Sequence, residues 1–305
     1  MATGTGTTSD LDLVKAGIDA VLKIQTKNGR LTFQTIAPTI DTKEGYYKAV
    51  VTSGYKDAGV YARGAPVPSD RKVRLFENDY YPKVFAKAWD YDIYTKDEDV
   101  YNQMGTNVGD IAIAMRRRKN KEAANLFNNG FDASGASNIY DGQPLFSTAH
   151  PGVGGGFLGS NRPAVGNSLS PYSVEAAVGN FFGQFDVNGE SMEFEGNLEL
   201  HVGNLLYMLA SRIINATQIA GSNDNDPNVV KQYITLHRND KITSATAHYY
   251  KSQTEDEHGL RTIQFSPYRI TSENEARTQL TVNVVSERYR CVVLKWQGTY
   301  GDPGQ

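Results

Sequence analysis

The hydrophobic positions along the chain change their spacing several times, and each change predicts a different element. Apolar residues recur at steps of three and four over 11–27, 96–129 and 204–219, which places them on one face of a helix in each segment. A further helix is expected to begin at Ser170, as its cap, with Pro171 in the first helical position. The helix over 96–129 would be ~45 Å long at 1.5 Å per residue, enough to cross a whole domain.

Strand-like patterns fill much of what remains. Between the first two helices, strands are expected at 46–52, 71–76 and 84–89, in a stretch with too few apolar residues to form its own core. This sparse pattern predicts a long hairpin that reaches away from the body. Four strands are expected nearer the C-terminus, at 229–236, 262–265, 278–285 and 288–296. The last two would be joined by a tight connection at Ser286 and Glu287, and the whole pattern is typical of an α+β fold.

Composition changes this picture in one respect, because it predicts a lean core. Hydrophobic residues make up 39% of the 305 residues, and a subunit of this kind often gains stability from partner chains. The formal net charge of -3 excludes a strongly basic nucleic-acid-binding protein. The basic run at 116–119 lacks interleaved aromatic residues, so we favour a helix face that meets acidic residues of a neighbour over a nucleic-acid contact.

Targeting patterns and cysteine usage add little chemistry. No apolar run reaches the ~18 residues that a membrane-spanning helix needs. Residues 1–9 are rich in Gly and Thr and lack the basic start and apolar core of a signal peptide, so we expect the chain to fold in a cytoplasm. The single cysteine, Cys291, lies in an apolar run and is expected to be a buried strand residue rather than a nucleophile.

The candidate chemistry is concentrated in one segment, where Ser147 and His150 stand three residues apart and suggest a serine hydrolase. The pair lacks the Gly-x-Ser-x-Gly setting of a nucleophile elbow, and Pro151 directly after the histidine indicates a turn. We therefore expect a hydrogen-bonded structural histidine and no catalytic residue. The other histidines form no metal-ligand pattern, and no phosphate or dinucleotide fingerprint is present, so neither a metal nor a cofactor is expected.

The same segment carries a resemblance to a known family. Residues 141–151 read Asp-Gly-Gln-Pro-Leu-Phe-Ser-Thr-Ala-His-Pro. They resemble the Asp-Gly-x-x-Leu-Phe-Ser-x-x-His segment of the major capsid proteins of tailed bacteriophages, in particular the Mu-like major head subunit family. The matching positions are Asp141, Gly142, Leu145, Phe146, Ser147 and His150. Residues 286–301 are also similar to the closing strand of such proteins, whereas Pro151 departs from the Asn-rich continuation that is common in the family.

The resemblance implies the Hong Kong 97-type capsid fold and a division of the chain into named parts. These would be an N-arm (1–40), an E-loop (41–95), a P-domain (96–196) with its spine helix (96–129) and a loop (130–170), an A-domain (197–275), and C-terminal strands (276–305) that return to the P-domain. In this family the E-loop lies over a neighbouring subunit. A sparse hairpin and a lean core fit that arrangement, because partner subunits complete them.

The resemblance also implies a structural protein rather than an enzyme. Copies of the chain would assemble in the host cytoplasm into hexamers and pentamers of an icosahedral virion shell around the double-stranded DNA of a tailed phage. Partners would be further copies of the chain, a portal protein, in some relatives decoration and scaffolding proteins, and packaged DNA without sequence-specific contact. Two alternatives stay open: an encapsulin-like bacterial compartment with the same fold, and a serine hydrolase that uses Ser147 and His150.

Overall fold

The computed structural model describes residues 31–53, 67, 72, 74–92, 103–132, 139–152, 156–219, 226–275 and 280–305. In chain order the elements are α2 (Thr32–Ile36), β1 (Thr39–Asp41), β2 (Tyr47–Thr52), β3 (Arg74–Tyr80), β4 (Lys83–Asp92), α3 (Gln103–Asn128), β5 (His150–Pro151), β6 (Phe157–Gly159), α4 (Pro171–Phe182), β7 (Leu198–Val202), α5 (Asn204–Asn215), the 3-10 turn η2 (Val229–Gln232), β8 (Ile234–Arg238), β9 (His248–Ser252), the 3-10 turn η3 (Glu255–Glu257), β10 (Leu260–Glu275), β11 (Leu280–Val293) and β12 (Thr299–Asp302). The chain is an α+β protein, as predicted. The helix expected over 11–27 lies outside the described residues.

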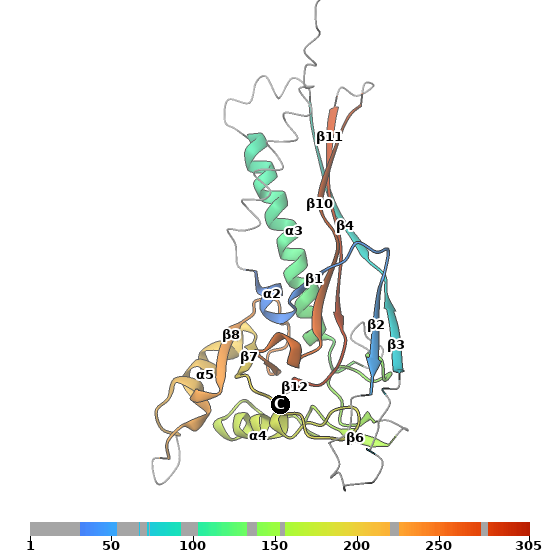
Figure 1. Cartoon of the computed structure of the whole chain (residues 1–305). Helices are drawn as coiled ribbons and strands as arrows, with labels where there is room; N and C mark the ends of the chain where they lie inside the picture. Colours follow the sequence, from blue (N-terminus) through green and yellow to red (C-terminus); the bar gives the residue numbers. More distant parts are fainter. Residues whose placement is uncertain are drawn as a thin grey trace, which may run out of the picture.

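The upper part of the molecule is α3 running beside a long, narrow sheet (Figure 1). The strand order of this sheet is β1-β10-β11-β4. The apolar face that the sequence predicts for α3 is confirmed, because Val108, Ile111 and Met115 are buried against Ile270 of β10 and Val285 of β11. The spacing of three and four residues puts these side chains on one stripe of the helix, which is the stripe the sheet covers.

Strand β11 is continuous, so the predicted connection at Ser286 and Glu287 is wrong. Ser286 pairs with Arg269 of β10 on one side and with Ala86 of β4 on the other. A strand with partners on both edges has its backbone hydrogen bonds satisfied across two polar residues. The Ser-Glu pair looked like a turn because the partners that make it a strand lie far away in the sequence.

The lower part is a second sheet of strand order β12-β9-β7-β8, with α4 and α5 packed on it (Figure 1). Every residue of β7 is buried. Leu198, Leu200 and Val202 join the apolar cluster shared with α4 and α5. Because side chains alternate along a strand, Glu199 and His201 point to the opposite face.

Two predicted boundaries in this part are corrected. Residues 229–232 form η2 rather than the start of a strand, because the Tyr233 N–H turns back to donate to the carbonyl of Val230. Helix α5 ends at Asn215 instead of 219. There the side-chain amide of Asn228 donates to the carbonyls of Ile213 and Ala216 and satisfies the last turn.

Each of the two sheets contains strands from both sides of residue 275, where the resemblance implies a domain boundary. Strand β10 pairs with β11 from Leu260 to Glu275, so this part of the expected A-domain lies in the long sheet. Conversely, β12 pairs with β9 and lies in the second sheet, although it belongs to the expected C-terminal strands. The predicted domain ranges stay a prediction. If they hold, the chain passes from the A-domain range into the long sheet at β10 and returns to the second sheet at β12.

The predicted hairpin is present, but its described strands pack against the body instead of reaching away from it. The strands expected at 46–52 and 84–89 correspond to β2 and β4, and the one at 71–76 begins three residues later as β3. The Tyr80 hydroxyl donates to the carbonyl of Val293 at 2.8 Å. Its ring joins a small apolar cluster with the long sheet, so the base of the β2–β3 hairpin is anchored there.

Candidate functional site at the junction of the two sheets

Residues 141–151 lie where the end of α3 meets the second sheet. Leu145 and Phe146 are fully buried. The ring of Phe146 lies 6.2 Å from that of Phe127 at the end of α3 and 5.5 Å from that of Tyr249 in β9. The segment therefore packs apolar side chains between α3 and the second sheet.

Two glycines from distant parts of the chain leave room for the Phe146 ring. A Cβ atom added at Gly130 or at Gly301 would lie within 2.6 Å of a carbon of that ring. Contacts this short do not occur between real side chains, so both positions require glycine unless the ring moves. The backbone after α3 and the backbone of β12 thus press on the same aromatic side chain.

The Asp-Gly pair at the start of the segment builds a turn. Gly142 has a φ of 75°, a left-handed conformation that glycine adopts without strain. One oxygen of the Asp141 carboxylate accepts the N–H of Gln143 at 3.0 Å. The other oxygen lies 2.7 Å from Nδ1 of His150. The turn therefore brings the carboxylate back to the histidine that ends the segment.

Both ring nitrogens of His150 are engaged in buried contacts. Nε2 lies 3.1 Å from Oδ1 of Asn161, which also accepts the N–H of Ser147 at 2.9 Å. The amide group of Asn161 donates to the carbonyl of Leu145 at 2.7 Å, which fixes its orientation. The imidazole stacks on Trp296 with ring centres 4.4 Å apart. Asn161 was not predicted as part of this site, because it is one polar residue among many in a loop rich in Gly, Asn and Ser.

The hydroxyl of Ser147 is occupied by its own turn. It accepts the N–H of Ala149 at 3.2 Å and lies 3.3 Å from the carbonyl of the same residue. A serine nucleophile needs a base within hydrogen-bond reach, and within the described part of the chain the imidazole of His150 contacts Asp141 and Asn161 instead. The geometry supports a structural junction at the residues that first suggested a hydrolase.

The basic run at 116–119 contains a buried cation that the sequence did not distinguish from its neighbours. The ammonium of Lys119 lies 2.7 Å from Oε1 of Glu287 and 2.5 Å from Oε1 of Gln264. It also lies 4.9 Å from the ring centre of Phe33. Lys119 therefore ties α3 to α2 and to the middle of the long sheet, whereas Arg117 is exposed.

A second buried ionic group lies on the polar face of β7. The Glu199 carboxylate is 2.9 Å from the ammonium of Lys251 and 3.3 Å from Nε2 of His201. Burial alone would raise the pKa of Glu199, but the hydrogen bond to His201 and the charge of Lys251 outweigh it and lower the pKa to about 2. His237 stacks on His201 at 5.1 Å.

Two further titratable groups are held in uncharged forms by burial. Burial lowers the pKa of His258 to about 2, and its Nδ1 accepts the N–H of Leu260 at 3.2 Å. Burial raises the pKa of the Cys291 thiol to about 11. A raised pKa disfavours the nucleophilic thiolate, which is consistent with the structural role expected for this cysteine.

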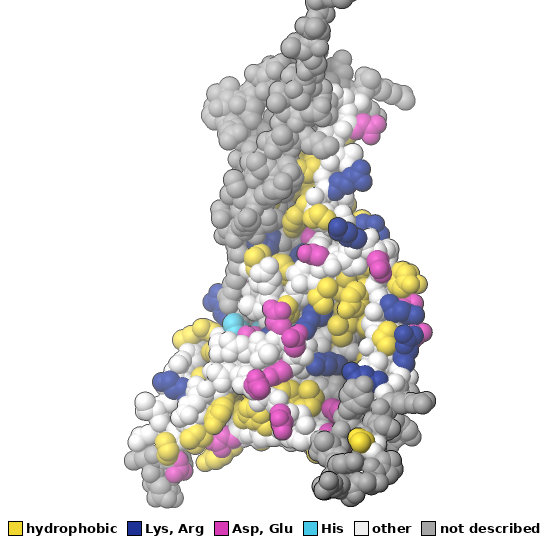
Figure 2. Space-filling model, viewed as in Figure 1, with side chains coloured by type: hydrophobic (Ala, Val, Ile, Leu, Met, Phe, Trp, Pro, Cys, Tyr) yellow, Lys and Arg dark blue, Asp and Glu magenta, His cyan; other side chains and the backbone are white. Residues whose placement is uncertain are grey.

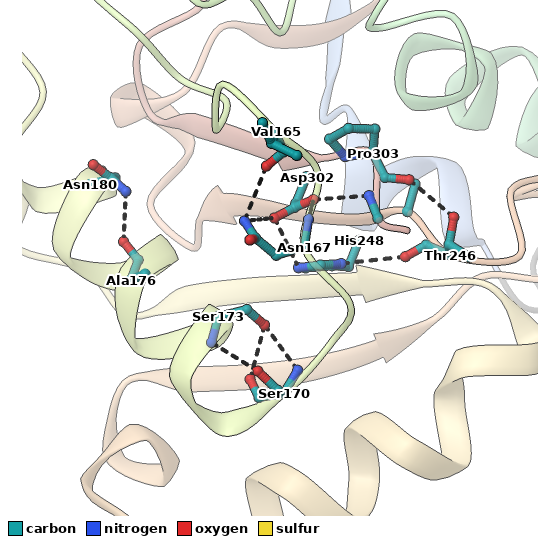
Figure 3. A network of polar contacts seen from close by, with 12 residues as sticks. Val165, Asn167, Ser170, Ser173, Ala176, Asn180, Thr246, His248, Asp302 and Pro303 are labelled. Atoms are coloured by element: carbon teal, nitrogen blue, oxygen red, sulfur yellow. Dashed lines mark hydrogen bonds and ion pairs between the residues drawn. The ribbon is translucent and has the colours of Figure 1, made fainter.

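A polar network fixes the last strand to the start of α4 (Figure 3). The Asp302 carboxylate accepts the backbone N–H of Asn167 at 2.8 Å and its side-chain amide at 3.1 Å. Three residues later, Ser170 caps α4 by accepting the N–H of Ser173 at 3.1 Å, and the Ser173 hydroxyl accepts the N–H of Ser170. The cap and the proline at the first position, Pro171, are confirmed.

The described residues contain no group of three or more His, Cys, Asp or Glu side chains arranged to hold a metal ion. None of the described helices is both long and apolar enough to cross a membrane.

Comparison with known proteins finds similarity in structure only. No protein-family model matches the sequence, and no curated protein matches it significantly. Among solved structures, the virus-like particle from Pyrococcus furiosus superposes with a TM-score of 0.56 at 9% identity, covering 94% of this chain and 97% of that one. The SrpI encapsulin of Synechococcus elongatus PCC 7942 gives 0.53 at 10% identity over 89% of each chain. The procapsid protein of bacteriophage JBD30 gives 0.52 at 13% identity over 98% of this chain and 76% of that one.

These similarities extend over nearly the whole chain and are consistent with one another. The chain has the Hong Kong 97-type fold of phage major capsid proteins and encapsulins, as the resemblance of residues 141–151 implied. Within that fold, the signature residues Asp141, Phe146 and His150 lie at the contact between α3 and the second sheet.

Proposed function

We propose that this chain is the major capsid protein of a tailed bacteriophage. Copies of it would form hexamers and pentamers of an icosahedral shell that encloses double-stranded DNA. The observation that carries the proposal is the fold, which the chain shares along almost its whole length with a phage procapsid protein. An encapsulin-like compartment has the same fold and is the alternative.

The surface of the single chain supports a subunit that partners complete. Large apolar side chains are exposed on separate elements: Val84 is 64% exposed in β4, Phe157 is 73% exposed in β6, and Leu205 is 79% exposed in α5. On the face drawn in Figure 2, acidic side chains gather over the middle of the lower body and basic ones along the side of β2 and β3. Separate apolar and charged areas suit head-to-tail contacts, in which different surfaces of identical chains meet.

Within this proposal the chain is not an enzyme. Ser147 and His150 serve as parts of the junction, because each makes its hydrogen bonds to other groups. The additional partners would be a portal protein and, in some phages, decoration and scaffolding proteins. DNA would be enclosed without sequence-specific contacts.

Electron microscopy of the full-length chain after expression tests the proposal. We expect closed shells with five-fold and six-fold clusters of subunits, and a protein that stays monomeric or dimeric at high concentration would contradict it. Particles from cells that make the chain from its native locus separate the two shell types. Nuclease-protected DNA indicates a phage capsid, whereas one enclosed protein species indicates an encapsulin.

A truncated variant tests the role expected for the hairpin. Replacing residues 53–73 by a short Gly-Ser turn keeps β2, β3 and the anchor at Tyr80. We expect a folded, soluble subunit that does not close shells, because the segment that would lie over a neighbour is missing. Normal shells from this variant would refute the assignment of an E-loop to 41–95. The circular dichroism spectrum of the variant serves as the control for folding.

A further inference from the structure

One face of helix α5 carries large apolar side chains into solvent. Leu205 is 79% exposed and Met208 is 68% exposed. With Arg212 they follow each other at steps of three and four residues, so they form one stripe along the helix. The opposite stripe, with Ala210 and Ile214, is buried in the core of the second sheet. In Figure 1 the helix forms one end of the lower body.

The exposed stripe of α5 is accompanied by an excess of positive charge. Arg212 belongs to the stripe, and Arg238 lies over the ring of Tyr207, 5.8 Å from its centre. Lys231 lies in η2, which packs into the same core as α5. All three cations are exposed, and none of them forms an ion pair with a described residue. Asp226, which lies beyond the end of α5, offsets at most one of these charges.

A second surface of the same chain has the opposite charge. Segments 193–195 and 255–257 lie side by side, because the N–H of Glu195 donates to Oε1 of Glu257 at 2.9 Å. Arg261 and Lys295 lie near the second segment and compensate part of its charge. The two segments together carry five carboxylates, so an excess of negative charge remains: Glu193, Glu195, Glu255, Asp256 and Glu257. We call these two segments the acidic surface.

An exposed aromatic ring adjoins the acidic surface. Phe185 is 41% exposed. Its backbone bridges to Ser191, and the N–H of Met192 donates to the carbonyl of Gln184 at 3.0 Å, so the hairpin holds the ring close to Glu193. The acidic surface therefore combines an apolar side chain with carboxylates, as α5 combines apolar side chains with cations. Surfaces of this kind are complementary in both charge and polarity.

We propose that the exposed stripe of α5 docks on the acidic surface of a second copy of the chain. Because the two surfaces lie on different elements, the contact is head-to-tail and can repeat around a ring. Leu205 and Met208 would cover Phe185, and Arg212 would meet carboxylates at the edge of the contact. The inference rests on the proposed shell function and deepens it, since it names the surfaces through which neighbouring copies meet.

Two charge-reversed variants of the full-length chain test the contact. Arg212→Glu/Lys231→Glu makes the α5 side acidic, and Glu193→Lys/Glu195→Lys makes the acidic surface basic. All four side chains are exposed, so the unassembled subunits should keep the circular dichroism spectrum and melting temperature of the wild type. The matched control, Lys43→Glu/Lys121→Glu, reverses two exposed lysines outside both surfaces.

Light scattering over a dilution series measures the lowest subunit concentration at which each protein assembles. We expect each variant alone to need about tenfold or more of the wild-type concentration, because like charges meet at the contact. An equimolar mixture of the two variants should recover assembly, because alternating copies again join opposite charges. Alternation is possible in a ring of six and impossible in a ring of five. Electron microscopy of the mixture should therefore show six-fold clusters and few closed shells.

Two results would overturn the inference. One is assembly of either variant at the wild-type concentration. The other is a mixture that assembles no better than the separate variants, or a control that Glu193→Lys/Glu195→Lys rescues equally well. Should a reversed variant not fold, Arg212→Gln and Glu193→Gln replace the pair. Each should then raise the required concentration about threefold, and no change would contradict the contact.

Failure of the shell proposal gives a different result. A wild type that associates without closing shells, and whose association depends on these charges in the same way, would keep the contact and reject the shell. A wild type that stays monomeric at every concentration would reject both. A wild type that closes shells while both charge-reversed variants also close them normally would reject the contact alone.

Discussion

At the scale of single residues, Lys119 of α3 and Glu287 of β11 form a buried ion pair. Both side chains are almost completely buried, at 9% and 2% side-chain exposure. A charge left alone in such a place is far more costly than the intact pair is stabilising. Removing one of the two side chains should therefore destabilise the fold more than removing both.

This dependence predicts that Lys119→Met lowers the free energy of unfolding by about 3–5 kcal/mol, because Glu287 stays buried without its partner. The double variant Lys119→Met/Glu287→Leu should recover most of the loss. Urea unfolding of the unassembled subunit, followed by tryptophan fluorescence, measures both. Lys121→Met on the exposed side of the same helix is the control and should change stability by less than about 0.5 kcal/mol. A double variant as unstable as the single one would show that packing rather than charge dominates here.

The signature segment predicts unequal effects for its serine and its histidine. Ser147→Ala loses a turn hydrogen bond and should cost about 1 kcal/mol. His150→Leu removes the stacking on Trp296 and leaves Asp141 buried without its partner, so it should cost about 3 kcal/mol or more. Thermal unfolding measures the difference. Ester hydrolysis by the wild type that Ser147→Ala abolishes would instead establish the hydrolase alternative.

At the scale of elements, Phe146 connects α3 to β12 through close backbone contacts. Gly301→Ala should cost about 1–3 kcal/mol, because its new Cβ would overlap the Phe146 ring. Gly179→Ala is the control, since a Cβ there meets nothing within 4 Å. In the middle of α4 it should be neutral or stabilising by up to about 1 kcal/mol. Adding Phe146→Leu to Gly301→Ala relieves the overlap, and a double variant no more stable than the Gly301→Ala single variant would argue against this mechanism.

At the scale of the whole molecule, buried histidines predict that stability falls as the pH decreases. Burial lowers the pKa of His201 to about 4 and that of His258 to about 2, from 6.5. Below pH 6.5 the unfolded chain therefore binds protons that the folded chain excludes, so the free energy of unfolding decreases from about pH 6.5 towards pH 4. Each histidine contributes up to about 1.4 kcal/mol per pH unit in this range.

Denaturant unfolding of the unassembled subunit at a series of pH values measures this slope. His258→Asn should make the slope shallower, because the amide can accept the N–H of Leu260 in place of Nδ1 and does not titrate. The lowered pKa of Glu199 acts in the same direction at lower pH, between about 4.5 and 2. An identical slope in the wild type and in His258→Asn would show that His258 does not contribute.

The sequence predicted the elements that local physics determines and missed those that distant partners determine. The apolar stripe of α3 and the cap at Ser170 depend on residues that are close together in the sequence, so the sequence pattern predicted both. Glu287 looked like part of a turn because its partner, Lys119, lies on another element. Asn161 gave no signal for the same reason. The short segment at 141–151 identified the fold through its resemblance to a known family, and the structure places its residues at the contact between α3 and the second sheet.

The order of strands in the long sheet has a consequence for how the chain reaches its native state. Strand β11 pairs Leu280 with Asp92, and β10 pairs Thr262 with Thr39, so the sheet closes only when very distant segments meet. Sheets of such high contact order fold slowly, and their strand edges stay unpaired in the folding intermediates. Production at low temperature and with chaperones present should therefore increase the yield of soluble chain.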